Sequence, residues 1–367
     1  MRSRVKVIQV LPTLAYGDGV GNDTLAMDTI LKKHGYKTKV YAENIDRRIP
    51  EGIAEPVERM PRLKPWDVIL YHLSTGSELN DRLMEWNCRK IIVYHNITPP
   101  HFFQGYSEAS VALCHNGREA LQRLRDVPEL CLADSPYNKQ ELLDMGYRCP
   151  IEVLPILIPF QDYQREPGSE VMERYEGDGY TNILFTGRIS PNKKQEDIIE
   201  SFACYQKYYN NRSRLFLVGS YQGMETYQTR LVRYAEKLGV RNVIFTGHIP
   251  FQDILAYYHL ADLFLCLSEH EGFCIPLVEA MVFDLPIIAY DSTGVTGTLG
   301  DGGILMKEKK PLEVAGMINY VICHPEIRKQ LISGGHRRMQ AFQMEAVEEQ
   351  FLQELEGFIA ASNLRRK

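Results

Sequence analysis

Two glutamates lie eight residues apart in a segment that follows the apolar run Leu263–Leu267. Pro276 suits the first turn of a helix, which places Glu271 in a strand-to-helix loop and Glu279 on the helix behind it. The backbone N–H groups at this helix start would favour a bound anion. The segment therefore offers a carboxylate for hydroxyl groups, amides for a phosphate and a second carboxylate nearby. A loop glutamate and a glutamate on a solvated helix face give the same spacing, so the interpretation depends on the rest of the chain.

A second segment places two cations after another predicted strand. The apolar run Ile183–Thr186 ends at Gly187, and Arg188 and Lys193 flank the tight turn that follows. A guanidinium fork beside an ammonium point charge is suited to a diphosphate. Taken alone, this pattern is more often a pair of surface cations.

A glycine-rich loop follows the first predicted strand. Gly17, Gly19 and Gly21 form a G-x-G-x-G pattern, and Glu43 follows the second strand, as in dinucleotide-binding proteins. Asn22 stands where that fingerprint has its third glycine. The loop can instead allow the backbone to approach a bound phosphate or sugar.

His95 ends a fourth strand-like run, Lys90–Tyr94. A histidine at the carboxyl end of a strand can donate a hydrogen bond or shuttle a proton. A histidine that satisfies a loop carbonyl is equally compatible with this position, so His95 is a candidate only in combination with the other segments.

Strand-like and helix-like segments alternate along the chain, which predicts parallel sheets joined by right-handed crossovers. Prolines and glycines in residues 156–180 interrupt the alternation and predict a connection between domains with a short entry helix. Open α/β sheets bind ligands at the carboxyl ends of their strands, where all four segments lie. The expected strands are Val5–Leu11, Lys37–Tyr41, Trp66–His72, Lys90–Tyr94, Glu129–Ala133, Ile183–Thr186, Arg214–Val218, Asn242–Thr246, Leu263–Leu267 and Pro286–Tyr290, and the clearest helices are Asp23–Lys33, Asn138–Met145 and Thr226–Leu238.

The chain has 367 residues, which is enough for two domains. The expected fold class is α/β, with two Rossmann-like domains that face each other across a cleft. Residues 1–160 are expected to form the N-terminal domain and residues 161–344 the C-terminal domain. One apolar helical face in Glu345–Ala361 predicts a helix over about residues 345–367, which we expect to pack back towards the N-terminal domain.

The composition is that of an ordinary globular protein, with 44% apolar residues, 24% charged residues and a net charge of −5. The chain has no basic stripe of the kind that nucleic-acid-binding proteins carry. No apolar run reaches the roughly 18–20 residues of a membrane span. The eight cysteines show no CxxC spacing, which favours reduced residues over disulfides or metal ligands. These features indicate a cytoplasmic protein.

In combination, the segments resemble the family 4 glycosyltransferases of the GT-B fold. The pattern S-x-x-E-G-F-x-x-P-x-x-E-A at Ser268–Ala280 and G-R-x-x-x-x-K at Gly187–Lys193 stand in the family's order, and the resemblance covers nearly the whole chain. It implies retaining transfer of a hexose from a nucleoside-diphosphate sugar, GDP-mannose or a UDP-sugar. The implied acceptor is a glycan or a lipid-linked glycan in cell-surface polysaccharide synthesis. The resemblance implies no metal ion and no cofactor beyond the sugar nucleotide itself.

The resemblance also implies roles for individual residues. Arg188 and Lys193 match the pair that holds the diphosphate, and Glu271 matches the glutamate that meets the donor sugar. Glu279 matches the residue that holds the ribose, and His95 matches the histidine beside the sugar in the N-terminal, acceptor-side domain. The implied catalytic residues are His95, Glu271, Arg188 and Lys193. The implied donor-binding set is Gly17, Gly19, Gly187, Arg188, Lys193, His248, Ile249, Glu271, Gly272, Phe273, Cys274, Ile275 and Glu279.

Two positions depart from the family pattern. Cys274 stands where the family more often has glycine, a change that keeps a backbone contact but narrows the space for a sugar. After Asp291 the family often has G-G-x-x-E, whereas this chain has residues 292–296 with the sequence STGVT. This difference puts in question whether the loop of residues 292–296 contacts the sugar-nucleotide donor.

The expected partners are the nucleotide-sugar donor and the glycan or lipid-linked acceptor, without nucleic acid. Because such acceptors are often lipid-linked, peripheral contact with the inner face of the membrane is possible, although no clear basic amphipathic helix supports it. The sequence does not indicate an oligomeric state. Three alternatives remain: a sugar-nucleotide epimerase of the same fold, an NAD-dependent oxidoreductase that uses the Gly17 loop and Glu43, and a catalytically silent binding protein.

Overall fold

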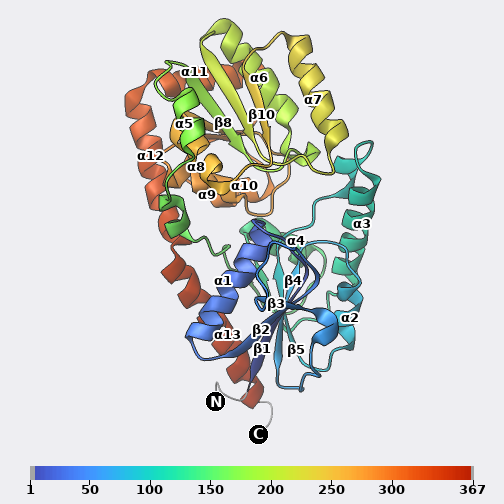
Figure 1. The fold of residues 1–367 in the computed structure, drawn as a ribbon. Coiled ribbons are helices and arrows are strands. Elements are labelled where there is room, and N and C mark those ends of the chain that lie inside the picture. Colours follow the sequence, from blue (N-terminus) through green and yellow to red (C-terminus); the bar gives the residue numbers. More distant parts are fainter. Residues whose placement is uncertain (1–4, 365–367) are drawn as a thin grey trace. The chain divides into compact units, whose positions relative to one another are not determined.

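A computed structural model describes residues 5–364, and the chain divides into two compact units (Figure 1). Unit 1 comprises Met1–Pro100, Ala109–Pro159 and Phe342–Lys367, and unit 2 comprises His101–Glu108 and Phe160–Ala341. Residues 365–367, the end of the helix expected from the sequence, lie outside the described part. Residues 101–108 were expected in the first domain but cluster with unit 2.

Aromatic contacts explain the placement of residues 101–108. The ring of Phe102 lies 6.0 Å from that of His270, and Tyr106 packs edge-on against Tyr227 with 5.1 Å between ring centroids. Such pairs contribute more than their buried area alone. The chain therefore leaves unit 1 after β5, contributes two aromatic side chains to unit 2, and returns to unit 1 in α3.

In the described residues, unit 1 contains a seven-stranded parallel sheet in the order β3-β2-β1-β4-β5-β6-β7. Its central strands are apolar and buried on both faces, as a sheet covered by helices requires. The strands are β1 (Lys6–Leu14), β2 (Lys37–Ile45), β3 (Ala54–Pro56), β4 (Val68–Leu73), β5 (Arg89–Tyr94), β6 (Leu130–Ala133) and β7 (Ile151–Val153).

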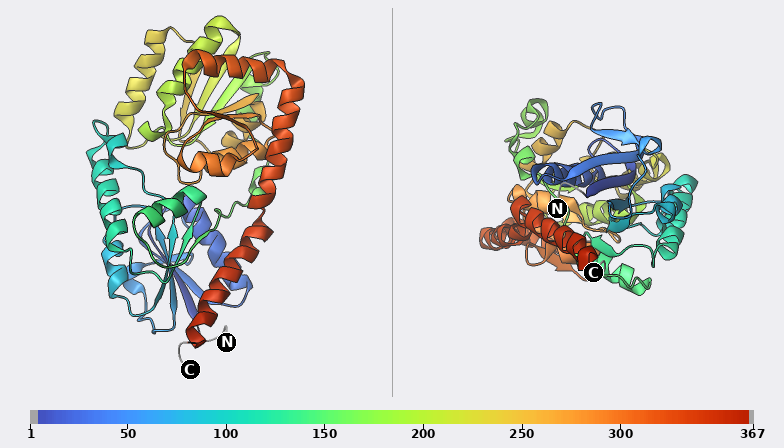
Figure 2. Two further views of the ribbon diagram at one scale, coloured as in Figure 1. Left: turned by 180° about the vertical axis from the view of Figure 1, so that it is seen from behind. Right: turned by 90° about the horizontal axis from the view of Figure 1, so that it is seen from below.

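Helices cover both faces of the unit 1 sheet. On one face, α1 and α13 pack against the strands, with Met27, Ile30, Val347 and Phe351 in a shared core; α13 is drawn in red in Figure 2. The expected return of the C-terminal helix to the first unit is therefore confirmed. The helices of unit 1 are α1 (Gly19–Lys33), α2 (Leu79–Glu85), α3 (Glu108–Arg123), α4 (Pro136–Asp144) and α13 (Met344–Leu364), with the 3-10 turn η1 (Val57–Arg59). The 3-10 turn η2 (Pro100–Phe103) begins at Pro100 of unit 1, and its other residues belong to unit 2.

Unit 2 repeats this architecture with a six-stranded parallel sheet, counted over the described chain, in the order β10-β9-β8-β11-β12-β13. Its strands are β8 (Thr181–Thr186), β9 (Ser213–Val218), β10 (Val243–Gly247), β11 (Leu263–Cys266), β12 (Ile287–Tyr290) and β13 (Ile304–Met306). Its helices are α5 (Ser169–Tyr175), α6 (Gln195–Tyr208), α7 (Glu225–Leu238), α8 (Phe251–Leu260), α9 (Ile275–Val282), α10 (Thr293–Leu299), α11 (Pro311–Cys323) and α12 (Pro325–Met339), with the 3-10 turns η3 (Phe160–Gln164), η4 (Pro191–Lys193) and η5 (Gln340–Phe342). The predicted pair of Rossmann-like sheets is confirmed.

Over residues 5–364, no helix combines the length and the apolar character that crossing a bilayer requires.

Candidate functional site

Three neighbouring strands of unit 2 end at glycines. Gly187, Gly219 and Gly247 stand at the ends of β8, β9 and β10, and all three have positive φ. A Cβ atom on Gly219 would lie 2.0 Å from the carbonyl oxygen of Gly187, so no other residue fits there. The predicted donor residues His248 and Ile249 follow Gly247 at this same edge of the sheet.

Lys193 belongs to η4, a turn that is fixed to the loop after β11. The backbone carbonyl of Asn192 accepts a hydrogen bond from the N–H of Glu269 at 2.9 Å, and its side-chain amide donates to the carbonyl of His270 at 2.9 Å. The hydroxyl of Ser190 donates to the side-chain oxygen of Asn192 at 2.7 Å. The turn that carries Lys193 is therefore held directly beside the loop that carries the first predicted glutamate.

Lys193 and Glu271 form an ion pair, with side chains 21% and 8% exposed. Burial opposes the charge on Lys193, but the Glu271 carboxylate outweighs burial and raises the pKa of Lys193 above its ordinary value. The sequence had assigned these two residues to different parts of a donor, and the structure joins them. Arg188 differs from Lys193, because it is exposed and no carboxylate of the described residues pairs with it.

The loop after β12 supports Glu271 through the backbone. The N–H of Glu271 donates to the hydroxyl of Thr293 at 2.9 Å, and the N–H of Gly294 donates to the carbonyl of Glu271 at 3.0 Å. A Cβ atom on Gly294 would lie 2.0 Å from the carbonyl oxygen of Gly272. This segment, which lacks the family's glutamate, therefore holds the neighbouring loop in place.

Strained backbone is concentrated near the predicted site residues. Of the six non-glycine residues with positive φ among those described, four are Asn96, Lys194, Cys274 and Thr293, with φ of 72°, 53°, 75° and 40°. Such conformations are costly and are typical of functional sites. The left-handed backbone of Cys274 also explains why glycine is the more frequent residue there.

Glu279 lies on α9 and receives two tyrosine hydroxyls. Tyr163 donates to one carboxylate oxygen at 3.0 Å and Tyr258 donates to the other at 2.6 Å. Thr186, at the end of β8, bonds to the Tyr258 hydroxyl at 2.5 Å. Burial raises the pKa of Glu279, while the two tyrosine hydrogen bonds oppose that rise. Both tyrosines were missed in the sequence, since they come from distant segments and no local motif connects them to Glu279.

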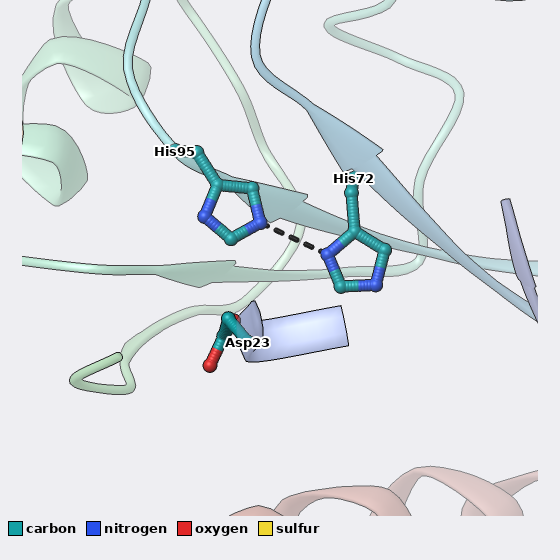
Figure 3. A group of neighbouring side chains, drawn as sticks. All are labelled: Asp23, His72 and His95. Carbon is teal, nitrogen blue, oxygen red and sulfur yellow. Dashed lines mark hydrogen bonds between the residues drawn. The ribbon is translucent and has the colours of Figure 1, made fainter. Parts of the chain in front are cut away.

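His95 lies in unit 1 at the end of β5, where its side chain is only 1% exposed. Its Nδ1 lies 3.0 Å from a carboxylate oxygen of Asp134, and its Nε2 lies 2.9 Å from Nδ1 of His72. Nε2 of His72 lies 3.0 Å from the side-chain oxygen of Gln9, whose amide nitrogen donates to the carbonyl of Thr24. Figure 3 shows the two rings facing each other. Both nitrogens of His95 are therefore used inside unit 1.

The hydrogen-bond donors and acceptors in the series from Gln9 through His72 and His95 to Asp134 determine the charge of His95. Gln9 presents an oxygen, so His72 donates from Nε2 and accepts at Nδ1; His95 must then donate from Nε2. With Asp134 ionised, His95 donates from both nitrogens and is an imidazolium. Burial lowers the pKa of His95, but Asp134 outweighs burial and raises it to about 9. Burial also holds the pKa of His72 well below its ordinary value.

Asp23 completes the buried group in unit 1 (Figure 3). Its carboxylate accepts the N–H of Leu157 at 2.8 Å, and burial raises its pKa to about 7 against the opposing effect of His95. Asp23, His72 and His95 offer ligand atoms within 4.8 Å of one another. The facing histidine nitrogens already bond to each other, however, so the geometry fits a hydrogen-bonded chain better than a metal site.

The N-terminal glycine loop is shorter than expected. The helix predicted from Asp23 begins at Gly19, because the side chain of Asp18 accepts the N–H of Val20 at 3.0 Å and caps it. Only Gly17 remains in a turn, with φ of 74°. The dinucleotide fingerprint also opens a helix within its glycines, so the departure from it lies at Asn22, where its third glycine would stand.

The predicted residues thus fall into two groups. Unit 1 holds Gly17, Gly19 and His95. Unit 2 brings the remainder to the carboxyl edge of its sheet, with Lys193 and Glu271 in direct contact and Glu279 on the helix that follows. Gly272, Phe273 and Cys274 form the loop that precedes this helix, and Ile275 is its first residue. The carbonyl of Phe273 accepts the Thr298 hydroxyl at 2.5 Å.

Residues 173–338 match the family described as glycosyl transferases group 1. The O-antigen chain mannosyltransferase B of Escherichia coli is 24% identical over 250 residues, which cover 62% of this chain and 65% of that protein. A D-inositol 3-phosphate glycosyltransferase of Jonesia denitrificans is 25% identical over 190 residues, which cover 50% of this chain and 44% of that protein. The matched regions span less than two thirds of either relative.

Solved structures share the fold over nearly the whole chain. The crystal structure of Anabaena HepE in complex with UDP and glucose matches with a TM-score of 0.73 at 20% identity, covering 96% of this chain and 100% of that one. WaaG, a glycosyltransferase involved in lipopolysaccharide biosynthesis, matches with a TM-score of 0.69 at 16% identity, covering 94% and 98%. The chain therefore has the GT-B fold expected from its sequence, and the match of residues 173–338 to the group 1 glycosyl transferases is consistent with the resemblance to family 4.

Proposed function

We propose that the protein is a retaining glycosyltransferase that moves a hexose from GDP-mannose or a UDP-sugar to a glycan or lipid-linked acceptor in cell-surface polysaccharide synthesis. The group 1 match and the names of the relatives support sugar transfer. HepE, which shares the fold, is solved with UDP and glucose. The relative named as an O-antigen chain mannosyltransferase supports GDP-mannose as the first donor to test.

One observation carries the proposal: Arg188 is exposed, forms no ion pair with the described residues, and stands at the same sheet edge as the ion pair of Lys193 and Glu271. An anion can engage Arg188 without breaking an internal salt bridge, and a charge-assisted pair with phosphate is strong and directional. Lys193 holds the Glu271 carboxylate in place, where sugar hydroxyls can donate to it. The edge thus offers a cation for a diphosphate and a fixed carboxylate for a sugar.

The transition state of glycosyl transfer resembles an oxocarbenium ion, and negative charge grows on the departing diphosphate. Arg188, Lys193 and the amides at the start of α9 would stabilise that charge, so we expect transfer without a metal ion. Glu279 lies on α9, behind the loop, and accepts hydrogen bonds from two tyrosines. This position suits a residue that binds the ribose and not a nucleophile. The donor phosphate would then take the acceptor proton on the face from which it departs, which preserves the anomeric configuration.

Arg188→Ala tests the diphosphate role. Loss of a charged hydrogen bond should weaken binding of GDP or UDP by about 1.5–3 kcal/mol, which is roughly 10- to 150-fold by calorimetry. Arg233→Ala is the matched control, because Arg233 is an exposed arginine on α7 of the same unit. Equal affinities for wild type and Arg188→Ala would remove Arg188 from the donor site. The anomeric configuration of the product, followed by NMR, tests retention, and activity that survives a chelator tests metal independence.

The alternatives give different products. A sugar-nucleotide epimerase would release an epimerised donor without an acceptor, which the same NMR assay would detect. An NAD-dependent oxidoreductase is disfavoured, because Asn22 stands where the fingerprint has its third glycine and Glu43 already accepts the hydroxyl of Ser77 at 2.6 Å. Stabilisation against heat by NAD, but by no sugar nucleotide, would reverse this preference.

A further inference from the structure

Two thiols converge on the carboxylate of Glu271. Cys266 ends β11 and Cys274 precedes α9, and their sulfur atoms lie within 4.8 Å of each other and of a Glu271 oxygen. All three residues are buried. The thiol of Cys266 also donates to the hydroxyl of Ser268 at 3.4 Å. The proposed transfer uses neither sulfur.

The position of Cys274 is unusual for a cysteine that only fills space. Its φ of 75° lies in the left-handed region, where glycine would relieve the strain that a side chain causes. The backbone at this position therefore favours glycine over any small apolar side chain. The strained cysteine places its thiol against a second thiol and a carboxylate.

Two thiolates and a carboxylate are a donor set for zinc and for the chemically similar cadmium ion. In a tetrahedral site with bonds of about 2.0–2.3 Å, ligand atoms lie roughly 3.3–3.8 Å apart, so modest side-chain rotations would close the present spacing. The charges also balance. Two thiolates and Glu271 carry three negative charges, and a divalent cation together with the adjacent Lys193 ammonium carries three positive charges.

We propose that Cys266, Cys274 and Glu271 form a binding site for a thiophilic divalent cation, Zn²⁺ or Cd²⁺. Each thiol gives its proton to solvent as its sulfur binds the ion. The ion occupies the carboxylate that the proposed function assigns to the donor sugar, so metal and sugar nucleotide exclude each other. Only this last consequence depends on the proposed function.

Cd²⁺ titration of the reduced protein, followed by the ultraviolet thiolate-to-cadmium charge-transfer band, tests the site. Wild type should bind one Cd²⁺ tightly, and Zn²⁺ should displace it. Cys274→Gly, which suits the local backbone, and Cys266→Ala should each weaken binding by more than about 10-fold, since even outer-sphere partners of metal sites contribute that much. Cys131→Ala is the control, because Cys131 also faces a thiol, that of Cys149 at 3.6 Å, and belongs to unit 1.

Unchanged Cd²⁺ affinity in Cys274→Gly, or loss of the tight site in Cys131→Ala, would overturn the proposal. The proposal would also be overturned if Cys266 and Cys274 lose two hydrogens on mild oxidation while the reduced protein binds no Cd²⁺. The two thiols would then form a disulfide and not a metal site. The band reports binding without turnover, so it separates this proposal from the enzyme activity. If Cd²⁺ binds but sugar nucleotides do not compete with it, the metal site stands and the sugar role of Glu271 fails.

Discussion

His95 carries a positive charge inside unit 1 because of the residues that its two nitrogens meet. Asp134 accepts at one side, and His72 can only accept at the other, since Gln9 fixes its tautomer. Under the proposed function, this arrangement holds the ring of His95 in one orientation. His72, Asp134 and Gln9 are therefore positioning residues that the sequence did not indicate.

The charge of His95 predicts how the stability of unit 1 depends on pH. Its pKa rises from 6.5 in the unfolded chain to about 9 in the folded one, so the stabilisation is complete below pH 6.5 and is lost as the pH rises through 9. The difference corresponds to at most about 3 kcal/mol. Urea unfolding at pH 7 and pH 9.5, followed by tryptophan fluorescence, should show this loss in wild type and a much smaller loss in His95→Asn.

His115→Asn is the control for this experiment. His115 is an exposed histidine on α3 of the same unit, 3.7 Å from Glu119. Its variant should keep the pH dependence of wild type. If His95→Asn also keeps it, the imidazolium assignment is wrong. Asp23 does not obscure the result. Because burial raises its pKa to about 7, its contribution to the stability of unit 1 is lost mainly as the pH rises towards 7, and little changes above that pH.

The sequence motifs place individual residues along the chain, but they do not identify the partners that those residues contact. The sequence located Lys193 and Glu271 at strand ends, but their ion pair depends on how β8 and β11 lie side by side. Tyr163 and Tyr258 escaped notice for the same reason. The cysteines were expected to be reduced residues rather than disulfides or metal ligands, and the sequence did not indicate that Cys266 and Cys274 lie close to each other across the loop.

At the scale of elements, the loop between β11 and α9 depends on two neighbours that share no sequence motif with it. The turn η4 holds it through Asn192, and the start of α10 holds it through Thr293 and Gly294. The side-chain amide of Asn192 and the hydroxyl of Thr293 each bond to a backbone group of this loop, and the N–H of Gly294 adds a bond between backbone groups. Both the side chains and the backbone path of the two neighbours therefore support the loop. The replacement of the family's G-G-x-x-E pattern is compatible with such a supporting role.

Gly294→Ala should disturb this loop. The new Cβ would lie 2.0 Å from the carbonyl oxygen of Gly272, and relieving that clash would move the backbone next to Glu271. We expect a loss of about 1–3 kcal/mol in stability, as for overpacked sites, together with weaker nucleotide-sugar binding. Urea unfolding and calorimetry measure the two effects.

Gly357→Ala provides the comparison. Gly357 lies within α13, and a Cβ atom there would meet nothing within 4 Å. Alanine should therefore stabilise the helix by about 0.5–1 kcal/mol and leave nucleotide binding unchanged. Wild-type behaviour of Gly294→Ala would show that α10 does not support the Glu271 loop.

The apolar pattern located the longer strands, but β1 and β2 end at Leu14 and Ile45, beyond the predicted ends at Leu11 and Tyr41. The short strands β3, β7 and β13 have three residues each, which is too few for periodicity to identify. The start of α1 was misplaced, because the cap formed by Asp18 lies among glycines that suggested a loop. Helix α13 was predicted from its apolar face, since four of those residues are buried against the unit 1 sheet.

At the scale of the whole molecule, the last helix completes the core of the first unit. Phe351 and Leu355 pack with residues of β1 and α1, and Arg89 stacks on the ring of Phe358 at 3.6 Å while donating to its carbonyl at 2.7 Å. Unit 1 therefore cannot bury this part of its core until the end of the chain is available. Each unit nevertheless has its own sheet and its own hydrophobic core.

Separate cores predict that the two units can be destabilised separately. Both tryptophans, Trp66 and Trp86, belong to unit 1, so tryptophan fluorescence reports that unit while circular dichroism reports both. Phe351→Ala removes a fully buried ring from unit 1 and should cost it about 3–5 kcal/mol. The fluorescence midpoint in urea should fall, and the dichroism curve should split into an early step and a step near the wild-type position.

Phe202→Ala is the matched substitution in unit 2, because Phe202 lies on α6 and is equally buried. It should move the dichroism curve and leave the fluorescence midpoint in place, since no tryptophan reports on unit 2. If Phe202→Ala lowers the fluorescence midpoint as much as Phe351→Ala does, the two units unfold together. The core of unit 1, which α13 completes, is then not independent of unit 2. If the fluorescence midpoint stays in place, unit 1 unfolds separately from unit 2, and truncation before α13 should unfold unit 1 while unit 2 stays folded.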